Sequence, residues 1–136
     1  PDYFHFAQAM PDLNKALGVT FSAGVLMETI LTFFLVLTVF SFNADKRNHT
    51  HFSGMIIGFV LAFGIIVGAA FTGAALNPAR AFGPTLLALA LNIEILSTNH
   101  LVYWIGPIMG GLIAAFVYAK LFLNDKQHKK TTTQGS

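Results

Sequence analysis

The sequence has no cysteine and few charged residues. Because none of the 136 residues is cysteine, a disulfide framework and a thiolate metal site are excluded. Charged residues make up 10% of the chain, whereas a soluble domain carries about 25%. From Phe52 to Ala79 there is neither a charged residue nor a histidine. With 54% hydrophobic residues, this composition indicates that lipid surrounds most of the chain.

Three apolar runs are long enough to cross a membrane. They cover residues 20–42, 52–71 and 101–123. At about 1.5 Å per residue, a helix of about 20 residues crosses a hydrocarbon core of about 30 Å. We therefore predict an all-α membrane protein with three transmembrane helices. We interpret residues 1–18 as a loop at the interface and residues 124–136 as a hydrophilic, disordered tail.

The segment between the second and third runs is apolar but interrupted. Pro78 cannot continue a helix from the second run, because it lacks an N–H group and clashes with the preceding turn. Asn77 suits the N-cap, and Pro78 suits the first helical position. A new helix over residues 78–91 would be about 20 Å long, so we predict a re-entrant half-helix. Backbone broken at membrane depth needs protein or water beside it, so the break predicts a polar cavity.

Basic residues predict the orientation of the chain. Lys46 and Arg47 lie in the loop over residues 43–51, and further lysines lie in the C-terminal tail. Three spans put this loop and the tail on one face, which the positive-inside rule makes cytoplasmic. The loop over residues 1–18 then lies outside.

Asn77 and Arg80 are the candidate functional side chains of the break. Asn77 can cap the half-helix with its oxygen and present its amide N–H groups to the cavity. Arg80 can donate hydrogen bonds to a neutral permeant and repel cations, since a guanidinium in hydrocarbon costs at least about 2.5 kcal/mol. The alternatives are an ordinary Asn-Pro cap and an arginine that reaches to a lipid headgroup.

Glu28 is the only acidic residue inside a span. A buried carboxylate needs several donors or a charged partner. It could relay protons or ions, or it could accept hydrogen bonds from irregular backbone near residues 73–76, which we favour. An ion pair between Glu28 and Arg80 is a further possibility that the sequence leaves open.

Four stretches of the sequence resemble the second half of an aquaporin, a member of the major intrinsic protein family. They are Glu28-Thr29, Phe71-Thr72-Gly73, the Asn-Pro-Ala-Arg-Ala-Phe-Gly-Pro stretch over residues 77–84, and Tyr-Trp-Ile-Gly-Pro over residues 103–107. The resemblance covers residues 18–122 and implies half of an inverted-repeat fold. The first half, with its own Asn-Pro-Ala element, would belong to a longer polypeptide.

The resemblance implies a role for each matched residue. Asn77, with Pro78 and Ala79, would lie at the centre of a pore, and Arg80 would lie in its selectivity constriction. Ile65 and Ala74 would belong to the same constriction, with Leu61 lining the pore one turn before Ile65. The carbonyls of three loop residues would form a polar stripe, and Glu28 would support their loop. These three residues are Gly73, Ala74 and Ala75.

The same resemblance implies a passive channel for water. Isoleucine at position 65, with Ala74 and Arg80, is similar to the tonoplast-intrinsic and ammonia-permeable branches of the family, which pass water, ammonia and hydrogen peroxide. Glycerol facilitators place an aspartate after the arginine, where this chain has Ala81, so we disfavour glycerol. The resemblance also implies a homotetramer in a lipid bilayer, an absence of enzymatic activity, and no cofactor, metal or nucleic acid.

Two other functions remain open from the residues alone. Secondary transporters also bind substrates at broken helices in mid-membrane. Such a transporter would need coupling-ion ligands near the break, where only Glu28 is available. A purely structural membrane protein could use the glycine pairs at four-residue spacing for helix packing. These pairs are Gly54/Gly58, Gly64/Gly68 and Gly106/Gly110.

Overall fold

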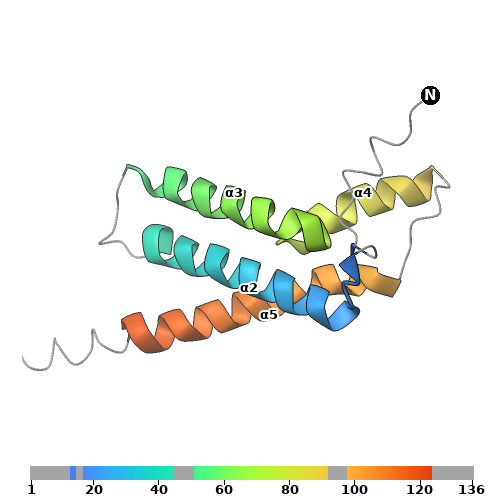
Figure 1. Ribbon diagram of the computed structural model, residues 1–136. Coiled ribbons are helices and arrows are strands. Elements are labelled where there is room, and N and C mark those ends of the chain that lie inside the picture. Colours follow the sequence, from blue (N-terminus) through green and yellow to red (C-terminus); the bar gives the residue numbers. More distant parts are fainter. Residues whose placement is uncertain (1–12, 15–16, 45–50, 92–97, 124–136) are drawn as a thin grey trace, which may run out of the picture.

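The structure is a computed structural model that describes residues 13–14, 17–44, 51–91 and 98–123. Every regular element in these ranges is a helix (Figure 1). Three helices are long and apolar enough to cross a membrane, over Phe21–Asn43, Ser53–Thr72 and Val102–Leu121. The prediction of an all-helical chain with three spans is therefore confirmed.

The first spanning helix is α2 (Phe21–Val39), which continues into the π-helical turn η2 (Phe40–Ala44). Thr20 caps its N-terminus, because the Thr20 hydroxyl accepts a hydrogen bond from the Ala23 N–H at 3.3 Å. One face of α2 carries its buried residues, which are Gly24, Glu28, Thr29, Leu31 and Thr32. Most of these residues are small or polar, and this face of α2 packs inside the protein.

The second span, α3 (Ser53–Thr72), is followed by a short loop and the half-helix α4 (Pro78–Ala90). As predicted, α4 begins at Pro78, whose missing N–H group is unneeded at the first helical position. With 13 residues, α4 is too short to cross a bilayer. Figure 1 shows α4 starting beside the end of α3 and running on past it.

The third span consists of α5 (Val102–Tyr118), preceded by the 3₁₀ turn η3 (Thr98–Leu101) and continued by the π-helical turn η4 (Ala119–Leu123). At the end of the bundle away from the loop between α3 and α4, the rings of Phe40 and Tyr118 stack with their centroids 5.4 Å apart. The two π-helical turns that end α2 and α5 therefore lie close together.

Helices α2 and α5 form the most extensive helix pair, and α3 packs on α2 (Figure 1). Two glycines of α5 allow this approach. A Cβ atom at Gly106 would lie 2.5 Å from the Cβ of Glu28, and one at Gly110 would collide with the Thr29 carbonyl oxygen. Backbone therefore packs directly on backbone, as small residues permit in membrane helices.

The other glycine pairs differ from one another. Gly64 and Gly68 of α3 face side chains of Leu76 and Leu31 respectively, so this pair also serves packing. Gly54 and Gly58 have no described atom within 4 Å of a Cβ built on them. The predicted helix contact is therefore not found at this pair within the described part of the chain.

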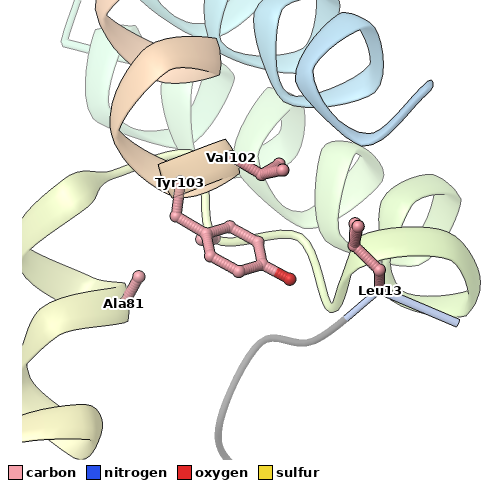
Figure 2. Packing of buried hydrophobic residues seen from close by; sticks show 5 residues of the cluster. Leu13, Ala81, Val102 and Tyr103 are labelled. Atoms are coloured by element: carbon pink, nitrogen blue, oxygen red, sulfur yellow. The ribbon is translucent and has the colours of Figure 1, made fainter. Parts of the chain in front are cut away.

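Two hydrophobic clusters enclose the loop between α3 and α4. The first joins the segment before α2, the loop, α4 and α5 (Figure 2), and its buried residues are Leu13, Ala75, Ala81, Val102 and Tyr103. The second lies between α2 and the loop, and its buried residues are Leu31, Ala74 and Leu76. Successive loop residues thus enter opposite clusters, which holds the loop from two sides.

Candidate functional site

The loop over residues 73–76 has an unusual backbone. Gly73 ends α3 in the left-handed region at φ 76°, which is a common helix end for glycine. Ala74 and Leu76 also have positive φ, at 51° and 52°. Left-handed backbone costs an L-residue roughly 1–2 kcal/mol. The surrounding contacts must therefore hold this conformation in place.

Glu28 supplies the main contact from α2, and it is fully buried. Its Oε1 atom accepts the Thr72 hydroxyl at 2.6 Å and the Ala75 N–H at 3.0 Å. Its Oε2 atom accepts the Leu76 N–H at 2.7 Å. Three donors therefore surround the carboxylate, which is the arrangement that the loop-support interpretation predicts. No ion pair joins Glu28 to Arg80, although both are described residues, and Arg80 is exposed.

A second bond of the Thr72 hydroxyl and two further hydroxyl groups complete the support. The Thr72 hydroxyl also accepts the Ala74 N–H at 3.2 Å. Thr32, one turn after Glu28, donates to the Leu76 carbonyl at 3.3 Å. Tyr103 of α5 donates its hydroxyl to the Thr72 carbonyl at 2.8 Å, and only 1% of its surface is exposed. The two helices α2 and α5 thus hold the same loop through buried polar side chains.

These bonds determine the direction of the loop carbonyls. In a trans peptide the N–H of one residue points opposite to the C=O of the residue before it. No described peptide bond is cis. Because the N–H groups of Ala74, Ala75 and Leu76 point toward Thr72 and Glu28, the preceding carbonyls point away from them.

The residues that carry these carbonyls differ in exposure. They are Gly73, Ala74 and Ala75, the three residues expected to form the polar stripe. Gly73 is half-buried, whereas Ala74 and Ala75 expose at most 1% of their surface. None of the three carbonyls accepts a hydrogen bond from a donor in the described ranges. Of the three residues expected to form the stripe, Gly73 is therefore the one that is partly exposed to solvent.

The start of α4 presents hydrogen-bond donors. The Asn77 Oδ1 atom accepts the Ala79 N–H at 2.8 Å, and the Asn77 carbonyl accepts the Ala81 N–H at 3.2 Å. Asn77 and Arg80 are both exposed. The Asn77 amide nitrogen, the Arg80 guanidinium and the Arg80 N–H have no partner among the residues that the structure describes. These three groups, together with the positive end of the helix dipole, make this terminus a donor site.

Ile65 and Leu61 lie one turn apart on α3 and are partly buried against the cluster of Leu31, Ala74 and Leu76. The structure therefore brings both residues to the loop side of α3. The Ala74 side chain itself is turned into this cluster, with its Cβ 3.0 Å from where a Cβ of Gly68 would lie. If Ala74 contributes to a constriction, it does so through its backbone.

Sequence reasoning missed two contributors to the site. Tyr103 was part of a matched motif, but no pattern predicts that its hydroxyl reaches the end of α3. For Asn14, in the segment before α2, the sequence predicts only an interfacial loop, yet Asn14 contacts α3 at residues 70 and 71. Within the described ranges, no group of three or more metal-ligating side chains gathers.

A family model and several curated relatives match this chain, and all of them belong to one family. The family model described as "Major intrinsic protein" matches residues 6–118. A "Probable aquaporin TIP-type" of Medicago sativa is 38% identical over 96% of this chain and 51% of its own length. "Aquaporin TIP4-1" of Arabidopsis thaliana is 39% identical over 93% of this chain and 49% of its own length. The chain thus spans about half the length of the curated relatives that it matches.

Proposed function

We propose that this chain, which belongs to the major intrinsic protein family, supplies half of the wall of a passive membrane channel for water and small neutral solutes. Its three apolar helices make it an integral, multi-pass membrane protein. The observation that carries the proposal is the loop at residues 73–77. There a buried carboxylate binds the backbone N–H groups, and free donors lie at the next helix start.

The donors at the start of α4 favour a water oxygen. Asn77 and Arg80 present N–H groups, and the helix terminus adds partial positive charge. A lone pair of water can accept from such groups, whereas the same groups repel a cation or a hydronium ion. We therefore propose that Arg80 and Asn77 exclude protons and cations and that Arg80 contributes to the selectivity constriction.

The loop carbonyls complement these donors. A water molecule that accepts from Asn77 or Arg80 still has two protons to donate. The Gly73 carbonyl points away from the Glu28 side and is free to accept one of them. Ile65 adds an apolar wall on the loop side of α3. This combination binds water weakly through few polar groups, which suits rapid passage.

The permeants include ammonia and hydrogen peroxide in this proposal. Both are small, uncharged and able to accept a hydrogen bond from Arg80. The half-buried Ile65 provides no hydrogen-bonding group that would restrict the constriction to water. The relatives that carry the TIP name support this branch of the family without deciding the permeants of this chain.

The complete pore needs partners. We propose that the missing first half of the same protein closes the lumen and that the complete protein forms a homotetramer in the bilayer. We further propose that the C-terminus and the loop over residues 43–51 lie in the cytoplasm, as the basic residues predict. In Figure 1 the last turns of α2 and α5 lie at one end of the bundle, as this topology requires.

Water flux tests the proposal directly. This chain is joined to the first half of the Arabidopsis thaliana aquaporin TIP4-1, and the purified chimera is reconstituted in liposomes. We expect osmotic shrinkage that is faster than in protein-free liposomes, depends weakly on temperature and does not depend on an ion gradient. TIP4-1 itself is the positive control. A helical, monodisperse chimera that leaves the shrinkage rate at the protein-free value contradicts the proposal.

A further inference from the structure

We infer that Asn14 is a positioning residue of the pore loop, which it holds by binding the C-terminal end of α3. The inference rests on the proposed channel function. Asn14 lies before α2, in a segment whose sequence predicts only an interfacial loop. It is 56 residues away from the helix end that it contacts.

Asn14 makes two short hydrogen bonds to α3. Its backbone N–H donates to the Phe71 carbonyl at 2.8 Å, and its side-chain Nδ2 donates to the Ala70 carbonyl at 2.8 Å. The same residue also organises its own segment. Its Oδ1 atom accepts the Leu17 N–H at 3.2 Å, and its carbonyl accepts the Val19 N–H at 3.2 Å. All the polar groups of Asn14 are therefore used, and both donors point at α3.

These bonds complete the hydrogen bonding of a helix end. The last four carbonyls of a helix have no partner within the helix and need one elsewhere. The Ala69 carbonyl accepts the Gly73 N–H, Asn14 takes the next two carbonyls, and Tyr103 takes that of Thr72. The first carbonyl without a described partner is that of Gly73. Asn14 and Tyr103 thus define where the accessible acceptors of the proposed pore begin.

Leu13 fixes the position of Asn14. Leu13 exposes only 4% of its surface and lies in the cluster that contains Ala75 and Val102 (Figure 2). A Cβ atom at Gly24 would lie 2.5 Å from the Leu13 side chain, so α2 also closes on it. Moving Asn14 away from α3 would expose Leu13 to water. Because Ala75 shares this cluster, the segment before α2 and the loop belong to one buried core, in addition to their connection through α3.

Loss of the Asn14 side chain would remove one of the two hydrogen bonds by which Asn14 holds the end of α3. The Ala70 carbonyl would then lack a partner, and the last turn could fray into the loop. The left-handed residues Gly73, Ala74 and Leu76 follow immediately, so a change in that turn changes the direction of the Gly73 carbonyl. A looser loop admits larger neutral solutes, because the distance from this carbonyl to Arg80 is no longer fixed.

Two variants isolate the side-chain donor. Asn14→Ala removes the whole amide, whereas Asn14→Asp keeps an oxygen for the Leu17 N–H but replaces the donor to Ala70 with a charged acceptor oxygen. Thr20→Ala is the matched control, because it removes the hydrogen bonds of the Thr20 hydroxyl with the Ala23 N–H and the Ser22 hydroxyl, at the start of α2, without touching α3. Each variant is made in the 136-residue chain in lipid nanodiscs and in the conducting chimera.

Amide hydrogen exchange and flux are the two measurements. In both Asn14 variants we expect exchange over residues 73–76 to be about fivefold faster, the factor that corresponds to one hydrogen bond of about 1 kcal/mol. We also expect the ratio of urea to water permeability per folded channel to rise at least about twofold. Thr20→Ala should change neither quantity.

The outcomes separate the two proposals. Unchanged exchange over residues 73–76 in both Asn14 variants overturns the positioning role, whether or not the chimera conducts. An unchanged permeability ratio per folded channel also overturns it, because a purely structural residue lowers only the amount of folded protein. A wild-type chimera that does not conduct contradicts the channel proposal, while the exchange data still decide whether Asn14 holds the loop.

Discussion

The Thr72 hydroxyl donates to the Glu28 Oε1 atom across 2.6 Å and joins the end of α3 to the middle of α2. Both residues are fully buried. The same hydroxyl oxygen accepts the Ala74 N–H, so one threonine connects the carboxylate with the first left-handed alanine of the loop. A hydrogen bond to a charged group contributes more than one between neutral groups, about 1.5–3 kcal/mol.

Replacing Thr72 by valine tests this connection with little change in shape. The variant leaves the Ala74 N–H buried without its acceptor and removes one donor from Glu28. We expect the free energy of unfolding to fall by about 2–3 kcal/mol. Chemical unfolding in detergent micelles, followed by circular dichroism, measures the change.

Thr38→Val is the matched control for that variant. The Thr38 hydroxyl donates only to the Phe34 carbonyl within α2, so its removal should cost less than about 1 kcal/mol. If Thr72→Val and Thr38→Val lower the free energy of unfolding equally, the contact between Thr72 and Glu28 contributes no extra stability.

Glu28→Gln tests the charge of the buried carboxylate. Glutamine keeps the size, but it offers one acceptor oxygen where three donors converge and turns an amide group toward backbone N–H. We expect a loss of about 3 kcal/mol in stability, because a buried donor is left unpaired next to another donor. In the chimera, water permeability per folded channel should fall severalfold. A glutamine variant with wild-type stability and flux would contradict the loop-support role.

The glycines of α5 give a clean steric comparison. Gly106→Ala places a methyl group 2.5 Å from the Glu28 Cβ, whereas Gly111→Ala meets no described atom within 4 Å. We expect Gly106→Ala to lower stability by about 2 kcal/mol through overpacking. Gly111→Ala should be neutral or stabilise by up to about 1 kcal/mol, since alanine favours the helix. Thermal unfolding of the two variants, measured side by side, gives the two changes in stability. Equal changes would contradict close packing of α2 on α5.

Arg80→Ala tests selectivity rather than folding. Arg80 is exposed and has no partner among the described residues, so its loss should leave stability unchanged. In the chimera we expect water flux to persist and a proton or cation leak to appear, because the repulsive charge is gone. A pH-sensitive dye inside the liposomes reports the leak. Liposomes that stay proton-tight with this variant would assign the exclusion to another group.

The sequence predicted the features that depend on composition and local chemistry. Long apolar runs predict the three spans, and Asn77-Pro78 predicts the start of α4 because proline requires it locally. The buried position of Glu28 also follows, since a lone acid within an apolar helix needs donors. The spans and the start of α4 depend on residues that are close together in the chain, whereas the donors to Glu28 lie 44 to 48 residues away from it.

Apart from the support of the loop by Glu28, contacts between distant segments could not be predicted in this way. Nothing near Asn14 indicates that it binds residues 70 and 71, and nothing near Ala74 or Leu76 indicates a left-handed backbone. Glycine spacing likewise does not distinguish Gly106, which meets α2, from Gly58, which meets no described atom. Each of these depends on which helices lie side by side, and periodicity alone does not specify that.

The backbone contact at Gly106 and Gly110 has a mechanical consequence. Because α2 and α5 touch without intervening side chains, the two helices tilt together when the bilayer becomes thicker or thinner. Glu28 and Tyr103, one on each helix, then keep their spacing. A change in bilayer thickness would therefore move α2, α5 and the loop that both helices hold as one unit.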